Sequence, residues 1–454
     1  MRVSVIGLGK LGASMVAGFA SRGFKVVGVD INQRAVDALN NGLAPVEETD
    51  MGKYISHYSD NITATVSYEE AIASTDISFV IVPTPSLPNG SFSLEYAKSA
   101  FADIGKALKG KLGYHVVVLT STVLPGSTRG VLIPIIEKLS GKTAGVDFGI
   151  CYNPEFIALG SVIRDFLNPD FYLLGEFDTR SGDALEAVHN KVSVNHAQVK
   201  RMSIENAELA KISINSYVTL KISYANMLSL LCEKIPNGDI DIVSDALGMD
   251  SRIGRKYLTG GTGFAGPCFP RDNVALNFFG DAVGTDTSLL VINHEFNNNL
   301  TSYHMNNIKN YLALGMKIAV LGLSYKENSY ITEESEGLKI AKALVDDGFE
   351  VVCHDAFVRS DQPELCGLKI TNNLNEIFML IPDLYIVCTC DPSYINLPAI
   401  ELTNNGAHSV ILIDMWRKNK HLFGHSHVNY VPVGINITPE AAQSKLSSFW
   451  LKGE

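Results

Sequence analysis

The sequence is poor in the features that mark secreted, metal-binding and membrane-spanning proteins. Its 454 residues include only seven cysteines, which are scattered and form no CxxC pair. An odd number of scattered cysteines in a large chain argues against a disulfide framework and predicts a reducing compartment. The eleven histidines show no metal-ligand spacing, so we predict no metal site.

Long apolar runs and positive charge are lacking as well. No uninterrupted apolar run reaches the roughly 18 residues that span a bilayer, and a predicted strand begins at residue 2, which leaves no room for a signal peptide. The net charge of −11 disfavours nucleic acid as a partner, because phosphate binding relies on clustered lysine and arginine. We therefore expect a cytoplasmic protein that binds neither membranes nor nucleic acid.

The sequence does contain two similar series of short apolar segments that alternate with helical patterns. Strands are predicted at residues 2–7, 25–30, 77–82, 116–120 and 148–152, and again at 317–323, 350–355, 384–390 and 409–414. Between the two series, residues 203–234 read as one helix of about 30 residues, about 45 Å long. We predict an α/β fold in which two Rossmann-like parallel-sheet domains, 1–200 and 306–454, are joined by this long central helix and a helical middle domain, 201–305.

A dinucleotide-binding fingerprint opens the chain. Gly7, Gly9 and Gly12 follow a predicted strand and begin a predicted helix, which is the context that GxGxxG requires. Asp30 stands eighteen residues after Gly12, at the end of the next strand, where a carboxylate can bond a ribose 2′-hydroxyl. The same carboxylate would repel a 2′-phosphate, so NAD is favoured over NADP.

A glycine-rich segment, residues 260–272, holds Cys268 and Asp272. Glycines let a substrate approach the backbone closely. A thiol nucleophile and a hydride acceptor in one chain favour oxidation of an aldehyde through a thiohemiacetal and a thioester. The alternative for a single cysteine is a small buried apolar residue, which the glycines and Asp272 make less attractive.

Other candidate residues are open to two readings. Glu155 follows a strand and either activates water or is simply solvated. Glu208, Lys211 and Asn215 share one stripe of the long helix, which either faces solvent or allows Lys211 and Asn215 to donate hydrogen bonds to a developing oxyanion. Thr122 either positions water or cofactor, or caps a helix.

Seven motifs in this order resemble the UDP-glucose/GDP-mannose dehydrogenase family, from residue 1 to about residue 435. They lie at 7–12, 84–86 with Gly90, 121–126, 153–156, Lys211 with Asn215, 263–272 and 322–326. Members of this family oxidise the C6 alcohol of a nucleotide sugar to a carboxylate with two NAD per turnover. The resemblance implies an NAD-binding domain, a helical middle through which two subunits form a homodimer, and a C-terminal domain that binds the nucleotide sugar.

The resemblance also implies roles for individual residues. Cys268 would capture the C6 aldehyde, Lys211 and Asn215 would stabilise charge on the C6 oxygen, and Glu155 would serve hydrolysis. The implied catalytic residues are Cys268, Lys211, Asn215, Asp272, Glu155 and Thr122. The implied cofactor-binding residues are Gly7, Gly9, Lys10, Leu11, Gly12, Asp30, Thr84, Pro85, Thr122, Glu155, Cys268 and Arg271. The implied substrate-binding residues are Glu155, Phe156, Lys211, Asn215, Lys221, Arg252, Tyr257, Gly263, Phe264, Cys268, Lys326 and Arg417.

The chain departs from the family pattern at several positions. Leu159 stands where related enzymes carry a second glutamate, and Glu333 stands where an arginine is usual. Pro267, Arg271 and Lys10 replace a small residue, a lysine and a common tyrosine. None of these changes removes the thiol, so we expect catalysis with an altered substrate preference.

UDP-glucose is the favoured substrate because that activity is the commonest in the family. GDP-mannose remains an alternative, since residues 116–149 look closest to GDP-mannose enzymes, and so do UDP-N-acetylhexosamines. Two other functions are open: a catalytically idle regulator that binds NAD or a sugar nucleotide, and a two-electron alcohol dehydrogenase. The latter gives Cys268 no role.

Overall fold

The computed structural model describes residues 1–157 and 160–451, so Leu159 lies outside the described residues. The chain divides into two compact units. The first unit comprises Met1–Ile214 and Ala275–Asp286, and the second comprises Asn215–Val274 and the chain from Thr287 onward. Two of the three boundaries fall inside helices, α9 (Ile204–Cys232) and α11 (Phe269–Ala282), and the third lies just before α12 (Ser288–Lys309).

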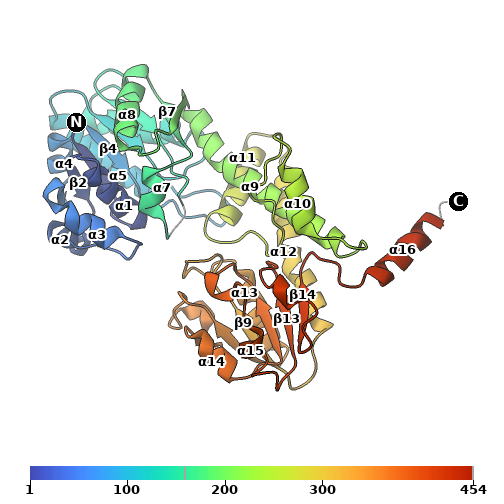
Figure 1. The fold of residues 1–454 in the computed structure, drawn as a ribbon. Helices are drawn as coiled ribbons and strands as arrows, with labels where there is room; N and C mark the ends of the chain where they lie inside the picture. The colour runs from blue at the N-terminus through green and yellow to red at the C-terminus, as the bar shows by residue number, and fades with distance from the viewer. Residues whose placement is uncertain (158–159, 452–454) are drawn as a thin grey trace. The chain divides into compact units, whose positions relative to one another are not determined.

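The first unit is built on an eight-stranded sheet with the order β3-β2-β1-β4-β5-β6-β7-β8 (Figure 1). Its strands are β1 (Val3–Ile6), β2 (Val26–Val29), β3 (Ile62–Thr65), β4 (Ile77–Val80), β5 (Val116–Leu119), β6 (Gly149–Tyr152), β7 (Phe171–Glu176) and β8 (Gln198–Ser203). All neighbouring strands are parallel except β6 and β7. Strand order therefore changes direction beside β1, where doubly wound sheets bind their ligands.

Helices cover both faces of this sheet, because its strands are apolar on both sides. One apolar core lies under α1 (Lys10–Ser21), α2 (Gln33–Asn40), α3 (Met51–His57), α7 (Val162–Leu167) and α8 (Thr179–Val192). The other lies under α4 (Tyr68–Ser74), α5 (Glu95–Gly110) and α6 (Ile133–Ser140).

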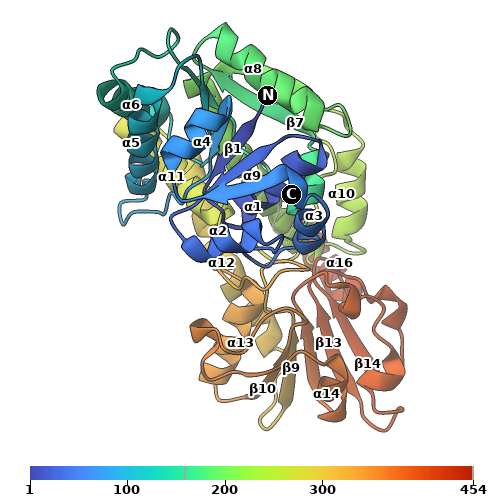
Figure 2. The same ribbon diagram turned by 90° about the vertical axis from the view of Figure 1, so that its left-hand side faces the viewer.

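The second unit contains a six-stranded parallel sheet with the order β11-β10-β9-β12-β13-β14 (Figure 2). Its strands are β9 (Lys317–Leu321), β10 (Glu350–His354), β11 (Lys369–Thr371), β12 (Leu384–Val387), β13 (Val410–Asp414) and β14 (Val428–Pro432). One core lies under α12 (Ser288–Lys309) and α13 (Glu336–Asp346), and the other lies under α14 (Leu374–Met379) and α15 (Ala399–Leu402). The unit also holds α10 (Ile240–Gly248) and α16 (Pro439–Leu451).

The predicted fold class is confirmed: two parallel-sheet regions flank a helical middle region. Every strand that the sequence predicts is present, although β12 ends at Val387 and not at residue 390. The sequence did not reveal β3, β7, β8, β11 and β14. Three of these, β3, β8 and β11, are polar and partly exposed, so they lack the continuous apolar run of a central strand.

Candidate active site

The fingerprint loop of the first unit has the shape that a dinucleotide needs. Gly7 has φ +97°, and a Cβ there would lie 2.0 Å from the carbonyl oxygen of Ile81. A Cβ on Gly12 would lie 1.8 Å from the carbonyl oxygen of Gly7, whereas a Cβ on Gly9 would meet nothing within 4 Å. Gly7 and Gly12 therefore shape the turn, and Gly9 leaves open space at the N-terminus of α1, where a pyrophosphate fits.

Asp30 is fixed beside this loop. Its Oδ2 accepts a hydrogen bond from Leu8 N at 2.6 Å, and its Oδ1 accepts one from Asn32 N at 2.8 Å. These bonds hold a carboxylate directly after β2, at the same sheet edge as Gly7. The arrangement suits a ribose 2′-hydroxyl and is unfavourable for a 2′-phosphate.

Thr84 and Thr122 meet at the same edge of the sheet. Thr84 Oγ1 donates a hydrogen bond to the carbonyl oxygen of Thr122 at 2.7 Å. Ser121 Oγ accepts from Val82 N at 2.8 Å and donates to Val82 O at 2.6 Å. The loops after β4 and β5 are thus tied together next to β1, so the structure brings the predicted cofactor-binding residues of this unit to one sheet edge.

Glu155 and Lys211 form the most unusual electrostatic feature of the first unit. Lys211 is 7% exposed, and its Nζ donates to the backbone oxygen of Glu155 at 2.8 Å and lies 4.4 Å from the ring centre of Phe156. The Glu155 Oε1 atom is buried without a hydrogen bond. Burial raises the pKa of the Glu155 carboxyl to about 8, although the Lys211 charge opposes this. A carboxyl that titrates near 8 is suited to exchange a proton with a reactant close to neutral pH.

Glu208 is a site residue whose role the sequence did not reveal. Its side chain is fully buried, and its carboxylate accepts from Gly126 N at 2.6 Å and Thr128 N at 2.9 Å. Burial raises the pKa of Glu208. The part of α9 that carries Glu208 and Lys211 is therefore buried. Glu208 orders the turn that follows Thr122.

In the second unit, Cys268 lies at the N-terminus of α11 and is exposed. The first helical turn is closed by Asp272 N, which donates to Cys268 O at 2.9 Å. Asp272 is 1% exposed; its Oδ2 accepts from Asn215 Nδ2 at 2.7 Å and its Oδ1 from Arg271 Nε at 3.3 Å. The partial positive charge of a helix N-terminus favours a thiolate. The predicted group of Cys268, Asn215, Arg271 and Asp272 is thus brought together.

Tyr325 is a second residue that the sequence analysis did not single out. Gly266 has φ +81°, and a Cβ there would lie 2.6 Å from the Tyr325 ring. Burial, together with the negative charges of Cys268 and Glu327, raises the pKa of Tyr325 to about 12. The phenol therefore supports the loop two residues before the thiol. Tyr325 lies within the motif at residues 322–326, one residue before Lys326. This position is the sequence feature that could have indicated its role.

The other predicted substrate residues of the second unit are more dispersed. Lys221 Nζ donates to the backbone oxygens of Ile253 and Gly254 at 3.1 Å each. The Arg252 side chain is 85% exposed and pairs with Asp250 at 2.6 Å. Tyr257 has φ +70°, and its ring meets that of Phe269 edge-on. Lys326 Nζ lies 5.8 Å from the ring centre of Tyr325.

Arg417 is held differently from a ligand-binding cation. It is 3% exposed, and its N–H groups are directed at protein oxygens. The acceptors are Asp241 Oδ1 (3.0 Å), Met415 O (3.0 Å), Val433 O (2.9 Å), Thr259 O (2.9 Å) and Gly260 O (3.1 Å). Arg417 therefore fixes the start of the glycine-rich loop.

The second sheet repeats part of the dinucleotide fingerprint. Gly322 has φ +97°, like Gly7, and a Cβ on Gly337 would lie 2.0 Å from Gly322 O, much as Gly12 approaches Gly7. Here, however, fifteen residues separate the two glycines. Asp355, the counterpart of Asp30, is 3% exposed and its carboxylate accepts four backbone N–H bonds. A carboxylate that is satisfied in this way has little capacity left for a ribose.

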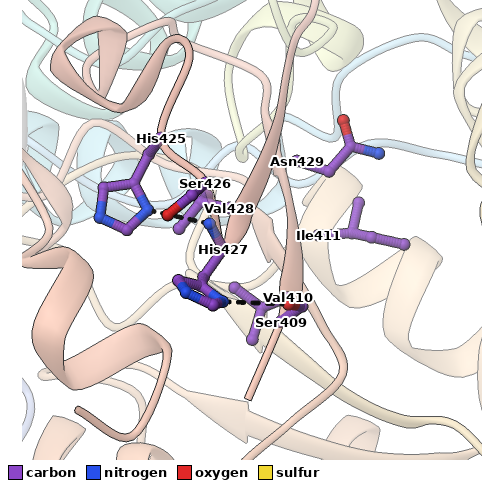
Figure 3. Close-up of a pocket in the computed structure, with 8 residues that line it drawn as sticks. All are labelled: Ser409, Val410, Ile411, His425, Ser426, His427, Val428 and Asn429. Carbon is purple, nitrogen blue, oxygen red and sulfur yellow. Dashed lines mark hydrogen bonds between the residues drawn. The ribbon is translucent and has the colours of Figure 1, made fainter. Parts of the chain in front are cut away.

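A pocket of about 340 Å³ lies at the opposite edge of the second sheet (Figure 3). Ser409, His425 and His427 line it, and Ser409 Oγ lies 3.4 Å from His427 Nδ1. These residues precede β13 and β14, whereas ligands of parallel sheets bind at the carboxyl ends of strands. We therefore do not place the active site there.

Within the described residues, no group of three or more His, Cys, Asp or Glu side chains is arranged to hold a metal ion. Across the same residues, no helix combines the length and apolar character needed to cross a membrane.

Comparison with known families identifies all three parts of the chain. Residues 1–193 match the NAD binding domain of the UDP-glucose/GDP-mannose dehydrogenase family, residues 205–299 its central domain and residues 319–420 its UDP binding domain. The chain belongs to the UDP-glucose/GDP-mannose dehydrogenase family. Its cofactor is NAD, and the family expected from the motifs is confirmed.

Individual relatives agree with this assignment. The chain is 34% identical to GDP-mannose 6-dehydrogenase of Pseudomonas syringae pv. syringae, over 79% of this chain and 81% of the relative. It is 35% identical to UDP-glucose 6-dehydrogenase AglM of Haloferax volcanii, over 80% and 85%. A solved UDP-glucose dehydrogenase from Pyrobaculum islandicum matches with a TM-score of 0.84 and 30% identity, covering 96% of this chain and 98% of that structure. The protein is a nucleotide-sugar 6-dehydrogenase.

The open space at Gly9 can be tested by substitution. Gly9 has φ −69°, which alanine tolerates, and its Cβ would meet no protein atom within 4 Å. Gly9→Ala should therefore keep the melting temperature of the protein while its methyl group obstructs the pyrophosphate, raising the Kd for NAD by about tenfold or more. Calorimetric titration with NAD measures this, with Gly110→Ala as the control because a Cβ there is also unobstructed. Unchanged NAD affinity in Gly9→Ala would contradict the assignment.

Proposed function

We propose that the protein oxidises the C6 alcohol of UDP-glucose to the uronate, with the removal of four electrons and with Cys268 as the covalent nucleophile. The observation that carries this proposal is the exposed Cys268 thiol at the N-terminus of α11, next to the linked pair Asn215 and Asp272, in a chain that also binds NAD. A simple alcohol dehydrogenase has no use for such a thiol.

The proposed reaction consists of two oxidation steps and one hydrolysis step. The C6 alcohol loses a proton and a hydride to become an aldehyde, and the Cys268 thiolate adds to its carbonyl carbon to give a thiohemiacetal. Loss of a second hydride from that carbon, together with the proton of its hydroxyl group, leaves a thioester. Water then attacks the thioester, releasing the carboxylate and restoring the thiol. Bound NAD supplies the hydride acceptor, and two molecules are consumed for each sugar.

Five further residues are proposed to assist. Lys211 and Asn215 lie one turn apart on α9 and stabilise negative charge as it develops on the C6 oxygen. Glu155 takes a proton from the attacking water, a role for which its raised pKa is suited. Thr122 and Asp272 help to place that water. Apart from Arg417, whose N–H groups are bound to protein oxygens, the other cofactor and substrate residues named from the motifs keep the roles that the family resemblance implies. The domain limits 1–200, 201–305 and 306–454 are proposed on the same basis.

UDP-glucose is proposed as the sugar nucleotide on three grounds. The C-terminal match is described as a UDP binding domain, and both the Haloferax relative and the Pyrobaculum structure are UDP-glucose enzymes. GDP-mannose is the second candidate, because several relatives at 29–34% identity are GDP-mannose 6-dehydrogenases.

The nucleophile and the substrate are tested together by counting NADH. With limiting UDP-glucose and excess NAD, two NADH per sugar are expected, and GDP-mannose should give little. Cys268→Ser should lower kcat by about a thousandfold or more, since the thioester cannot form. Cys366→Ser is the matched control, because Cys366 is also an exposed cysteine. One NADH per sugar, or full turnover by Cys268→Ser, would contradict the thioester route; two NADH with GDP-mannose alone would change the substrate.

The role of Glu155 predicts a particular pH profile. A general base works in its ionised form, so kcat should rise as the pH increases towards about 8, where half of the Glu155 carboxyl is ionised. Glu155→Gln should lower kcat by about a hundredfold and remove this rise. The pH dependence of Cys268 alkylation reports the titration of the thiol separately. A Glu155→Gln variant that keeps the same rising limb would show that another group is responsible.

A homodimer through α9 is also proposed. One face of this helix carries Tyr217, Tyr224, Met227 and Leu231 at positions that recur every three to four or seven residues, and they are 61, 51, 39 and 54% exposed. An apolar stripe with this spacing is suited to packing against a second copy of the same helix. Light scattering after gel filtration should give the mass of a dimer, and Tyr224→Asp with Leu231→Asp should give a monomer. Leu314→Asp, at a fully exposed loop position, should remain dimeric; a monomeric wild type would contradict the proposal.

A further inference from the structure

The backbone of the loop that carries Cys268 is held by side chains, because the loop has no regular secondary structure of its own. Asn226 Oδ1 accepts from Gly261 N at 2.7 Å. Asn297 Oδ1 accepts from Phe264 N at 2.7 Å, and its Nδ2 donates to Phe264 O at 3.0 Å. Arg417 holds the start of the loop, as described above. Between these contacts lies Gly263, whose N–H is bound by a different kind of group.

That group is the carboxylate of Glu336, the first residue of α13. Glu336 Oε2 accepts the hydrogen bond from Gly263 N at 2.7 Å. Its Oε1 is hydrogen-bonded to Nδ1 of His304, on α12. Glu336 and His304 are 6% and 2% exposed, so both ionisable groups are removed from water. A buried carboxylate is tolerated only with a partner of this kind.

We propose that Glu336 is a positioning residue for the reaction, and that it acts as a unit with His304 to fix Gly263 and, through it, the segment that presents Cys268. The proposal rests on the proposed role of Cys268 as the nucleophile. Gly263 is five residues before Cys268, and a Cβ on Gly263 would lie 2.6 Å from Asn297 Oδ1, so the backbone is clamped closely from two sides. A displacement of about 1 Å at a reacting group can cost about a hundredfold in rate.

The charge state of the pair gives the proposal a pH dependence. Burial acts to lower the pKa of His304, but the charge and hydrogen bond of Glu336 outweigh this and raise it. Glu233, at the end of α9, adds negative charge; the Cys388 thiol, after β12, and the ring of Tyr303 also face the pair. Because the folded pKa of His304 lies above about 6.5, the support of the loop is complete below that pH and is lost as the pH rises through the folded value.

Glu336→Ala and Glu336→Gln test the proposal, with Glu334→Gln as the matched control. Glu334 is exposed on the same segment and pairs with Lys339. Glu336→Ala should lower kcat by about tenfold or more with the KM for NAD within about twofold, because this loop is misplaced while the fingerprint loop of the first unit is untouched. Glu336→Gln retains an oxygen for Gly263 N, so it should restore most of kcat and should no longer lose activity at alkaline pH.

Two readouts do not require turnover. Hydrogen exchange over residues 259–268 should be faster in Glu336→Ala, and the rate of Cys268 alkylation should change, while Glu334→Gln matches the wild type in both. His304→Gln should mimic the loss of the charge, and the double variant with Glu336→Gln should be no worse than the single ones.

Several results would overturn the proposal. Wild-type kcat and exchange in Glu336→Ala would do so, and so would additive losses in the double variant. If Glu336→Ala does not fold, an alkaline limb that persists unchanged in both Glu336→Gln and His304→Gln would be decisive. If Cys268→Ser proves active, the proposed function fails, yet exchange and alkylation would still show whether Glu336 orders the loop.

Discussion

The structure depends above all on buried side-chain hydrogen bonds to the backbone of the loop that precedes α11. Glycines allow this loop its turns and let other groups approach it, but the same freedom means that the loop has no preferred conformation of its own. Order is supplied from outside, by Arg417, Asn226, Asn297 and Glu336. Each donor or acceptor is itself buried, where a hydrogen bond left unmade is costly. The thiol proposed as the nucleophile therefore follows a loop whose conformation is set by buried side chains outside it.

The two sheets show how one fold serves two purposes. Both begin with a glycine in the left-handed region after the first strand, and both have a second glycine packed against the carbonyl of the first. In the first unit the intervening loop is short and Asp30 accepts two backbone N–H bonds, which leaves capacity for a ribose. In the second unit the loop is longer, and the Asp355 carboxylate already accepts four backbone N–H bonds. Asp355 is therefore poorly able to accept further hydrogen bonds from a ribose. Among the described residues, the first unit therefore has the carboxylate and the short glycine loop that suit a dinucleotide, in agreement with the NAD binding domain matched there.

Burial also sets the proton chemistry. The carboxyl of Glu155 has its pKa raised to about 8, and the phenol of Tyr325 has its pKa raised to about 12, in both cases mainly because the charged form is removed from water. Lys211 reduces the effect on Glu155, and Cys268 adds to the effect on Tyr325. The first group is thereby able to exchange protons near neutral pH, and the second stays neutral beside the loop.

The sequence by itself determined what depends on neighbours along the chain. Apolar runs located the central strands, the spacing of Gly7, Gly9, Gly12 and Asp30 predicted the cofactor loop, and the glycines around Cys268 pointed to Cys268 as the proposed nucleophile. Tertiary structure alone decided which side chains are buried together. Glu208 gave no sign that it would order the turn after Thr122, Arg417 resembled a ligand-binding cation, and His304 and Glu336 belong to no motif. Most of their partners are 16 to 176 residues away in sequence. Such contacts follow from the packing of whole elements, which no local pattern encodes.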